Sequence, residues 1–158
     1  GAGSRDAERH ARGSSAAIIA HIQRLLDARR SVLLQPYLDR VDDYGETALI
    51  IFAGQFSHAI RKGPLLRRGE ASTSALFAPE QITPRTASAD ELALANEVVG
   101  VVPGGMPLYA RVDLIRDAAG TPCVLELELA EPSLFFAHAP GAAQRFAQRI
   151  VARAGQDR

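Results

Sequence analysis

Residues 109–134 read YARVDLIRDAAGTPCVLELELAEPSL, and this stretch decides the fold. Residues 108–117 and 121–129 alternate hydrophobic and polar side chains, which is typical of strands buried on one face. The short Ala-Ala-Gly connection between them predicts a β-hairpin. Its buried face should carry the hydrophobic residues of both strands. These are Leu108, Ala110, Val112, Leu114, Leu125, Leu127 and Leu129.

The same alternation gathers charged side chains on the other face of this hairpin. Arg111 and Asp113 point there from the first strand, and Glu126 and Glu128 from the second. Three carboxylates so close together repel one another unless a cation lies between them. Oxygen ligands of this kind are the ones that Mg²⁺ prefers. Two interpretations stay open: a Mg²⁺ site, or a solvated charge ladder in which Arg111 neutralises Glu126 across the pair.

The rest of the chain predicts more strands, three helices and one long loop. Residues 46–53 and 55–62 flank Gly54 as a second hairpin, and the SVLLQPYL stretch has strand composition. Ser88 and Glu91 form a capping box that begins a helix. The predicted helices cover residues 14–30, 88–100 and 140–154, the remaining predicted strand covers 31–38, and the predicted loop covers 63–87. The order α-β-β-β-α-β-β-α predicts an α+β fold, an antiparallel sheet with flanking helices.

Composition excludes several classes of protein. The 158 residues, 47% hydrophobic and 23% charged, suit one folded globular domain. Eighteen basic residues balance eighteen acidic ones, so neither nucleic acid nor a membrane is an expected partner. Cys123 stands alone, which excludes an internal disulfide and suits the cytoplasm. The histidines show no metal-ligand spacing and are expected at surface or packing positions. They are His10, His21, His58 and His138.

The acidic hairpin resembles the metal-binding end of ATP-grasp enzymes, such as D-alanine–D-alanine ligase and glutathione synthetase. In that family an Arg-x-Asp strand is followed by a Glu-x-Asn strand. Arg111 and Asp113 match the first strand and Glu126 the second, whereas Glu128 replaces the usual asparagine. The resemblance implies that Asp113, Glu126 and Glu128 bind Mg²⁺, or Mn²⁺ in its place. It also implies that Arg111 stabilises an anionic tetrahedral intermediate.

Motifs upstream of the hairpin agree with this resemblance. The QPYL motif resembles the family's adenine hinge, with Gln35, Tyr37 and Leu38 as walls of the slot. Glu46 stands where the family binds the ribose hydroxyls. Arg61 and Lys62 stand where it has a basic residue near the phosphates, and alternation allows only one of these two to face the cleft.

The remaining loop residues carry weaker expectations. Residues 1–13, which begin GAGSRD, resemble the remainder of the family's glycine-rich phosphate loop. Arg67 and Arg68 are expected in a solvated loop. Glu131 and Ser133 either line the acceptor site or form a turn with Pro132.

The order QPYL, FSHAIRKGP and LELELAEPSLF is similar to the glutathione-synthetase-like branch, which includes the cyclo-ligase of D-cycloserine biosynthesis. The resemblance implies that residues 1–155 are the C-terminal part of an ATP-grasp domain, with the N-terminal half of the enzyme absent. The implied function is ATP-dependent ligation of a small carboxylate to an amine, or a similar nucleophile, through an acyl phosphate. The fragment alone is expected to be inactive, and a missing half would expose apolar surface that favours association, for example as a homodimer. The alternatives are a non-catalytic nucleotide-binding module and a purely structural domain.

Overall fold

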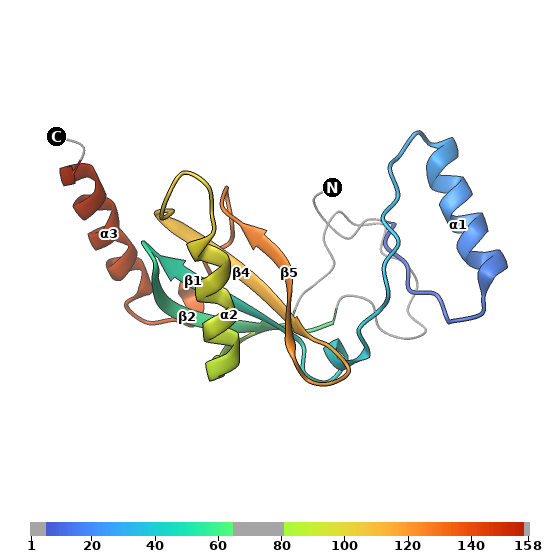
Figure 1. Cartoon of the computed structure of the whole chain (residues 1–158), viewed down its shortest axis with the longest axis horizontal. Helices are drawn as coiled ribbons and strands as arrows, with labels where there is room; N and C mark the ends of the chain where they lie inside the picture. The colour runs from blue at the N-terminus through green and yellow to red at the C-terminus, as the bar shows by residue number, and fades with distance from the viewer. Residues whose placement is uncertain (1–5, 65–80, 157–158) are drawn as a thin grey trace. The chain divides into compact units, whose positions relative to one another are not determined.

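A computed structural model of the chain describes residues 6–64 and 81–156. The described residues divide into two units, 6–37 and 38–64 with 81–156, which Figure 1 shows along one chain. The predictions for residues 1–5 of the glycine-rich loop and for Arg67 and Arg68 fall outside the described residues. Within the part that is described, no helix combines the length and the hydrophobicity that crossing a bilayer requires.

The second unit is built on a five-stranded antiparallel sheet with the strand order β3-β2-β1-β4-β5 (Figure 1). The strands are β1 (Glu46–Phe52), β2 (Gln55–Lys62), β3 (Ile82–Arg85), β4 (Tyr109–Arg116) and β5 (Pro122–Glu128). The helices are α1 (Ser15–Asp27), α2 (Ala89–Gly100) and α3 (Ala142–Gln156), with two short 3₁₀ turns at Asp39–Val41 and Phe136–His138. The predicted α+β fold, an antiparallel sheet with flanking helices, is confirmed.

Both predicted hairpins form. Ala53 and Gly54 connect β1 to β2 with φ values of 47° and 77°, the two positive values that a tight two-residue turn requires. Gly120, with a φ of 87°, closes the turn between β4 and β5. In that second hairpin Asp113 lies opposite Glu126, and the register shifts by a bulge between Asp113 and Leu114.

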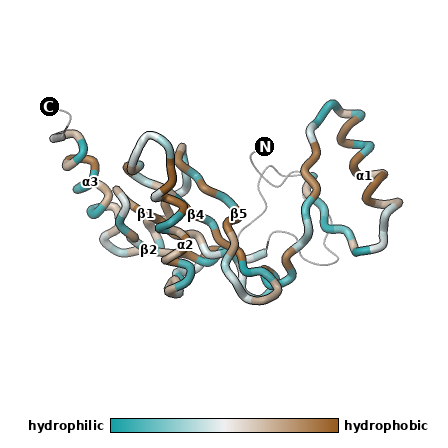
Figure 2. Tube along the Cα trace, in the orientation of Figure 1, coloured by the Kyte–Doolittle hydropathy of each residue, from teal (hydrophilic) through white to brown (hydrophobic). Residues whose placement is uncertain are grey.

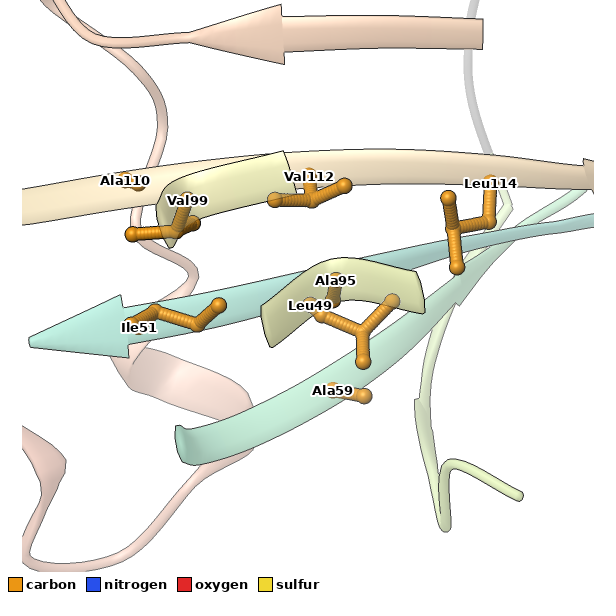
Figure 3. Packing of buried hydrophobic residues seen from close by; sticks show 8 residues of the cluster. All are labelled: Leu49, Ile51, Ala59, Ala95, Val99, Ala110, Val112 and Leu114. Atoms are coloured by element: carbon orange, nitrogen blue, oxygen red, sulfur yellow. The ribbon is translucent and has the colours of Figure 1, made fainter. Parts of the chain in front are cut away.

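The hydrophobic core lies between α2 and one face of the sheet (Figure 3). Its buried members are Leu49, Ile51, Ala59, Ala95, Val99, Ala110, Val112 and Leu114. The larger of these side chains each contribute roughly 1.5–3 kcal/mol by leaving water. Leu127 packs against this cluster as predicted, whereas Leu125 and Leu129 are 44% and 38% exposed. Leu125 differs from the prediction because the register shift skips it, with Glu126 opposite Asp113 and Val124 opposite Leu114; Leu129 follows the last residue of β5.

The predicted capping box fixes α2 to the sheet. Ser88 and Glu91 make both reciprocal capping contacts. The buried Glu91 carboxylate also accepts hydrogen bonds from Thr47 at 2.8 Å and from the Tyr44 hydroxyl at 3.1 Å. A helix cap thereby becomes a tie between α2 and the beginning of β1.

The apolar residues of α3 and α1 differ in their packing. In α3, Phe146 packs against Phe52 and Tyr109, with ring centroids 4.8 Å and 5.8 Å away. In α1, hydrophobic and hydrophilic residues alternate along the helix (Figure 2), yet Ile19 and Leu26 are 64% and 50% exposed.

The predicted order of helices and strands, α-β-β-β-α-β-β-α, is also the observed one, but one of the strands lies in a different part of the sequence. Residues 31–38, predicted as a strand, have no regular secondary structure, although they include the hydrophobic stretch drawn brown after α1 in Figure 2. Leu33 and Leu34 are 84% and 67% exposed. A strand needs a neighbour for its backbone hydrogen bonds, and in the described residues this segment pairs with none. The additional strand is β3, which lies inside the predicted loop of residues 63–87 and pairs with β2.

Candidate functional site

The sheet face opposite α2 carries six charged side chains on four neighbouring strands. We call them the charge cluster: Glu46, Lys62, Arg111, Asp113, Glu126 and Glu128. Strand register brings them together, because Lys62 lies opposite Glu46, Glu126 opposite Asp113, and Glu128 opposite Arg111. The residues between them, such as Val112 and Leu127, point to the core on the other face.

The three predicted metal ligands do converge. Asp113, Glu126 and Glu128 each place one carboxylate oxygen within 4.8 Å of the others. They form a gradient of exposure, since the side chain of Asp113 is 1% exposed, that of Glu128 26% and that of Glu126 55%. Burial, together with the negative charges of Glu126 and Asp113, raises the pKa of Glu128. A cation could approach this group from the side of Glu126.

Arg111 donates hydrogen bonds to two of these carboxylates. Its Nε donates to Asp113 Oδ1 at 2.8 Å, and its Nη2 donates to Asp113 Oδ2 at 2.9 Å and to Glu128 Oε1 at 2.6 Å. Glu126, predicted as its partner in the ladder, lies at 4.0 Å. Glu128, which the register sets directly opposite Arg111, is the closer partner. Burial alone would lower the pKa of Arg111, but the hydrogen bonds that it donates to Asp113 and the negative charges of Asp113, Glu128 and Glu126 raise it.

Lys62 extends the charge cluster toward β2. Its Nζ donates to Asp113 Oδ2 at 2.7 Å and is also ion-paired with Glu46. Burial opposes the charge of Lys62, yet the charges of Asp113 and Glu46 keep its pKa above the ordinary value. For Glu46, burial outweighs the attraction of Lys62 and raises its pKa to about 7.

The charge cluster holds four carboxylates and two cations, an excess of two negative charges when all are ionised. Buried charges are tolerated when they are paired. Lys62 and Arg111 pair with Asp113, Glu46 and Glu128, whereas Glu126 lies 4.0 Å from Arg111. The donor set and its charge therefore fit one divalent cation with oxygen ligands.

The structure separates the two candidate phosphate ligands. Lys62 lies in the charge cluster, while Arg61 points to the other face and donates to the carbonyls of Tyr44 at 2.9 Å and Asp43 at 3.0 Å. Gly45 allows the Arg61 side chain to lie this close to the backbone. Its φ is 77°, and a Cβ there would lie 2.7 Å from Arg61 Nε and 2.6 Å from the Lys62 carbonyl oxygen.

The sequence did not predict that Arg85 and Arg61 would hold the loop that precedes β1. Arg85 donates to the Tyr44 carbonyl at 2.7 Å and to Thr47 Oγ1 at 2.7 Å. Together with Arg61 it holds the backbone next to Glu46. Gly45 was a usable signal, because a glycine just before a hydrophobic strand indicates a turn or a close approach.

The segment after β5 packs over the charged face. The His58 ring, largely buried, lies with Nε2 2.9 Å from the Leu134 carbonyl oxygen. Burial lowers the pKa of His58 despite that carbonyl. Arg111 Nη1 lies 3.5 Å from the Ser133 carbonyl, and Glu131 has a φ of 57°. The chain bends at Ala130 and Glu131, and His58 has the packing role that the sequence allowed.

The predicted adenine slot falls at the boundary of the two units. Gln35 is exposed, and the Tyr37 ring is covered by the Arg9 guanidinium at 3.4 Å from its centroid. Both belong to the first unit, whereas Leu38 belongs to the second. Their role with adenine stays a prediction.

Comparison with known proteins gives one relative of substantial identity. The cycloserine biosynthesis protein DcsG of Streptomyces lavendulae is 38% identical over 157 residues, which cover 95% of this chain and 51% of the relative. The crystal structure of the D-cycloserine synthetase DcsG aligns with a TM-score of 0.80 at 36% identity, covering 95% of this chain and 52% of that one. The chain thus spans about half the length of the relative that it matches. No family model matches the sequence.

More distant solved structures show the fold. The ATP-grasp ligase PsnB, in complex with a precursor variant, Mg and ADP, aligns with a TM-score of 0.53 at 18% identity, covering 74% of this chain and 34% of PsnB. The D-alanine–D-alanine ligase of Bacillus anthracis in complex with ATP aligns with a TM-score of 0.54 at 18% identity, covering 87% and 45%. The resemblance to ATP-grasp ligases, expected from the motifs, is confirmed.

Proposed function

We propose that this chain, which shares the fold of ATP-grasp ligases, is the ATP- and Mg²⁺-binding portion of an ATP-dependent ligase. The enzyme would join a small carboxylate to an amine or a similar nucleophile. The observation that carries the proposal is the charge cluster. Its three converging carboxylates, Asp113, Glu126 and Glu128, lie on a chain that is 38% identical to a cycloserine biosynthesis protein.

Asp113, Glu126 and Glu128 would hold the Mg²⁺, for which Mn²⁺ can substitute. When bound, the ion neutralises charge on the nucleotide phosphates and orients them. Support comes from the converging oxygens and from Arg111, whose bonds to Asp113 and Glu128 fix both carboxylates. A ligating carboxylate that is itself hydrogen-bonded is the usual arrangement around a metal.

The nucleotide would lie along the same face of the sheet. Of the two basic residues at the end of β2, we assign the phosphate contact to Lys62, because Arg61 is engaged by backbone carbonyls on the other face. Glu46 would bind the ribose hydroxyls. Gln35, Tyr37 and Leu38 would line the adenine slot.

The reaction would take two steps. A carboxylate oxygen of the substrate attacks the γ-phosphorus of ATP, the bond to the β-γ bridging oxygen breaks, and ADP leaves. The nucleophile, having lost a proton, then attacks the acyl carbon, and inorganic phosphate leaves with the C–O bond pair. Arg111 would stabilise the oxyanion of the intermediate through Nη1, whose described contact, to the Ser133 carbonyl, is long at 3.5 Å.

The other wall of the cleft would come from the remaining half of the enzyme, since the chain matches about half of DcsG. We propose that this half supplies most contacts to the carboxylate substrate and the nucleophile. The chain by itself would bind nucleotide without turning it over.

The test begins with calorimetric titration of ATP into the chain, with Mg²⁺ and then with a chelator. We expect binding that requires Mg²⁺ and that Asp113→Asn abolishes. The control is Glu97→Gln, which removes an exposed glutamate of α2. The second stage supplies the other half and follows ¹⁸O from a labelled carboxylate into the released phosphate, as the acyl-phosphate route requires. Binding of equal strength without Mg²⁺, or phosphate free of label, would contradict the proposal.

A further inference from the structure

A second group of metal-ligating side chains lies in the first unit. Residues 6–10 are the first described residues of this unit, and a turn at Arg12 and Gly13 connects them to α1. Gly13 has a φ of 91°, and the Ser14 backbone and hydroxyl both donate to the Ala11 carbonyl, at 3.2 Å and 2.6 Å. The chain therefore reverses, and residues 6–10 run back along the helix.

Alternate residues of this segment contact α1 and the residues that follow it. His10 meets His21, Glu8 meets Arg24, and Asp6 is ion-paired with Arg30. These three contacts place the side chains of residues 6, 8 and 10 toward α1 and the residues that follow it. This antiparallel pairing joins two histidines that are eleven residues apart in sequence, which a search for metal-ligand spacing does not detect.

Glu8, His10 and His21 form a compact triad. His10 Nε2 lies 3.0 Å from His21 Nδ1 and 3.7 Å from Glu8 Oε2. The side chains of His10 and His21 are 17% and 12% exposed, and that of Glu8 is 29% exposed. One ligand atom from each residue lies within 4.8 Å of the others.

These separations match those around a small transition-metal ion. Two nitrogens bound to one tetrahedral Zn²⁺ at about 2.0–2.1 Å lie about 3.3 Å apart. The observed 3.0 Å and 3.7 Å lie on either side of that value, so small adjustments would complete the site. Without a metal, the 3.0 Å contact between the two rings requires one of them to donate a hydrogen bond to the other.

The surroundings of the triad are those of a supported site. Arg24 donates to Glu8 Oε1 at 3.0 Å, which orients the carboxylate and leaves Oε2 facing His10. His21 Nε2 is buried and, among the described residues, has no hydrogen-bond partner, although Glu8 Oε1 lies 3.5 Å away. Coordination through Nδ1 would fix the proton on Nε2, directed at that oxygen.

We propose that Glu8, His10 and His21 bind one divalent transition-metal ion of the Zn²⁺ class. Two imidazoles and one carboxylate suit Zn²⁺, whereas Mg²⁺ prefers an all-oxygen set. Three protein ligands leave one position for water or another small ligand. The bound ion would fasten residues 6–10 to α1. The triad shares no residue with the charge cluster, so its metal binding can be measured separately from that of the charge cluster.

The test is calorimetric titration of Zn²⁺ into the chain in the presence of excess Mg²⁺, which occupies oxygen sites. We compare the wild type with His10→Gln, Glu8→Gln and His21→Gln. The matched controls are His138→Gln, which removes a histidine outside the triad, and Asp113→Asn, which damages the charge cluster. We expect one Zn²⁺ per chain in the wild type and both controls, and affinity at least about tenfold weaker in each triad variant.

Imidazole ¹⁵N NMR provides the second readout, since coordination shifts the signals of His10 and His21 and leaves that of His58 unchanged. His10→Gln and Glu8→Gln alter the segment before the helix, so they remain informative if His21→Gln disturbs α1. Wild-type chain that takes up no Zn²⁺, or triad variants that bind it as tightly as the wild type, would overturn the proposal. So would loss of Zn²⁺ binding in Asp113→Asn alone.

Discussion

The two faces of the sheet are buried by different means. Under α2, β1, β2 and β4 contribute only hydrophobic side chains to the core cluster. On the other face, the same strands, with β5, carry the charge cluster, in which Asp113, Arg111 and Lys62 are 0%, 6% and 8% exposed. The face under α2 combines this apolar packing with one buried polar tie, in which Glu91 accepts hydrogen bonds from Thr47 and Tyr44. With all its groups ionised, the charged face carries two more negative than positive charges, and this excess supports the proposal that it binds a cation.

The largest effect is expected from Asp113→Ala. The change leaves Lys62 and Arg111 buried without their shared partner, and breaking a buried ion pair typically costs about 3–5 kcal/mol. Urea unfolding followed by circular dichroism measures the loss. A loss below about 1 kcal/mol would mean that water reaches these cations and that the charged face is in effect a surface.

Leu49→Ala provides the matching change on the apolar face. Leu49 is fully buried in the core cluster, and Leu→Ala changes at such sites cost about 2–5 kcal/mol. The two faces should respond differently to salt, since screening acts on charges and not on a cavity. Urea unfolding of Asp113→Ala and Leu49→Ala at low and at high salt measures this difference. Equal salt dependence of both variants would remove the distinction between the faces.

The pH dependence of stability should carry a contribution from Glu46. Its pKa is raised by burial from 4.5 to about 7, so the folded chain binds more protons than the unfolded chain between these values. Stability from this group is therefore greatest below its unfolded pKa and is lost as pH rises through about 7. Glu46→Gln should remove that decline. The difference between variant and wild type isolates Glu46 from His58, whose lowered pKa acts in the opposite direction.

The smallest effect is expected from Glu126→Gln. Its side chain is 55% exposed and lies 4.0 Å from Arg111, so without a divalent ion the free energy of unfolding should change by less than about 1 kcal/mol. The same variant should lose much of the stabilisation that Mg²⁺ with ATP provides. Glu126 would then contribute to stability only when the ligand is bound, unlike the residues of the apolar core, which contribute with or without it. Calorimetric melting with and without the ligand measures both effects.

Local patterns predicted much of the structure. Alternation in residues 108–117 and 121–129 predicted the hairpin and the convergence of Asp113 with Glu126 and Glu128, because both depend on neighbours in sequence. The capping box at Ser88 and Glu91 was predicted for the same reason.

What failed depended on residues distant in the chain or on small shifts of register. Residues 31–38 have strand composition but pair with no strand in the described structure. The register of β5 adds Glu128 as a closer partner of Arg111 than the predicted Glu126, and the contact between His10 and His21 depends on a reversal at Gly13. Composition and spacing do not encode these features.

The central claim is that the charged face binds a divalent metal and nucleotide together. It is tested most directly by thermal unfolding of the chain with Mg²⁺ and ATP, for the wild type and for Asp113→Asn. A ligand that binds only the folded state must raise the melting temperature, and at one hundred times its dissociation constant it adds about 2.7 kcal/mol. We predict a clear rise for the wild type and none for the variant. Equal melting temperatures with and without ligand in the wild type, or an equal rise in both proteins, would contradict the account.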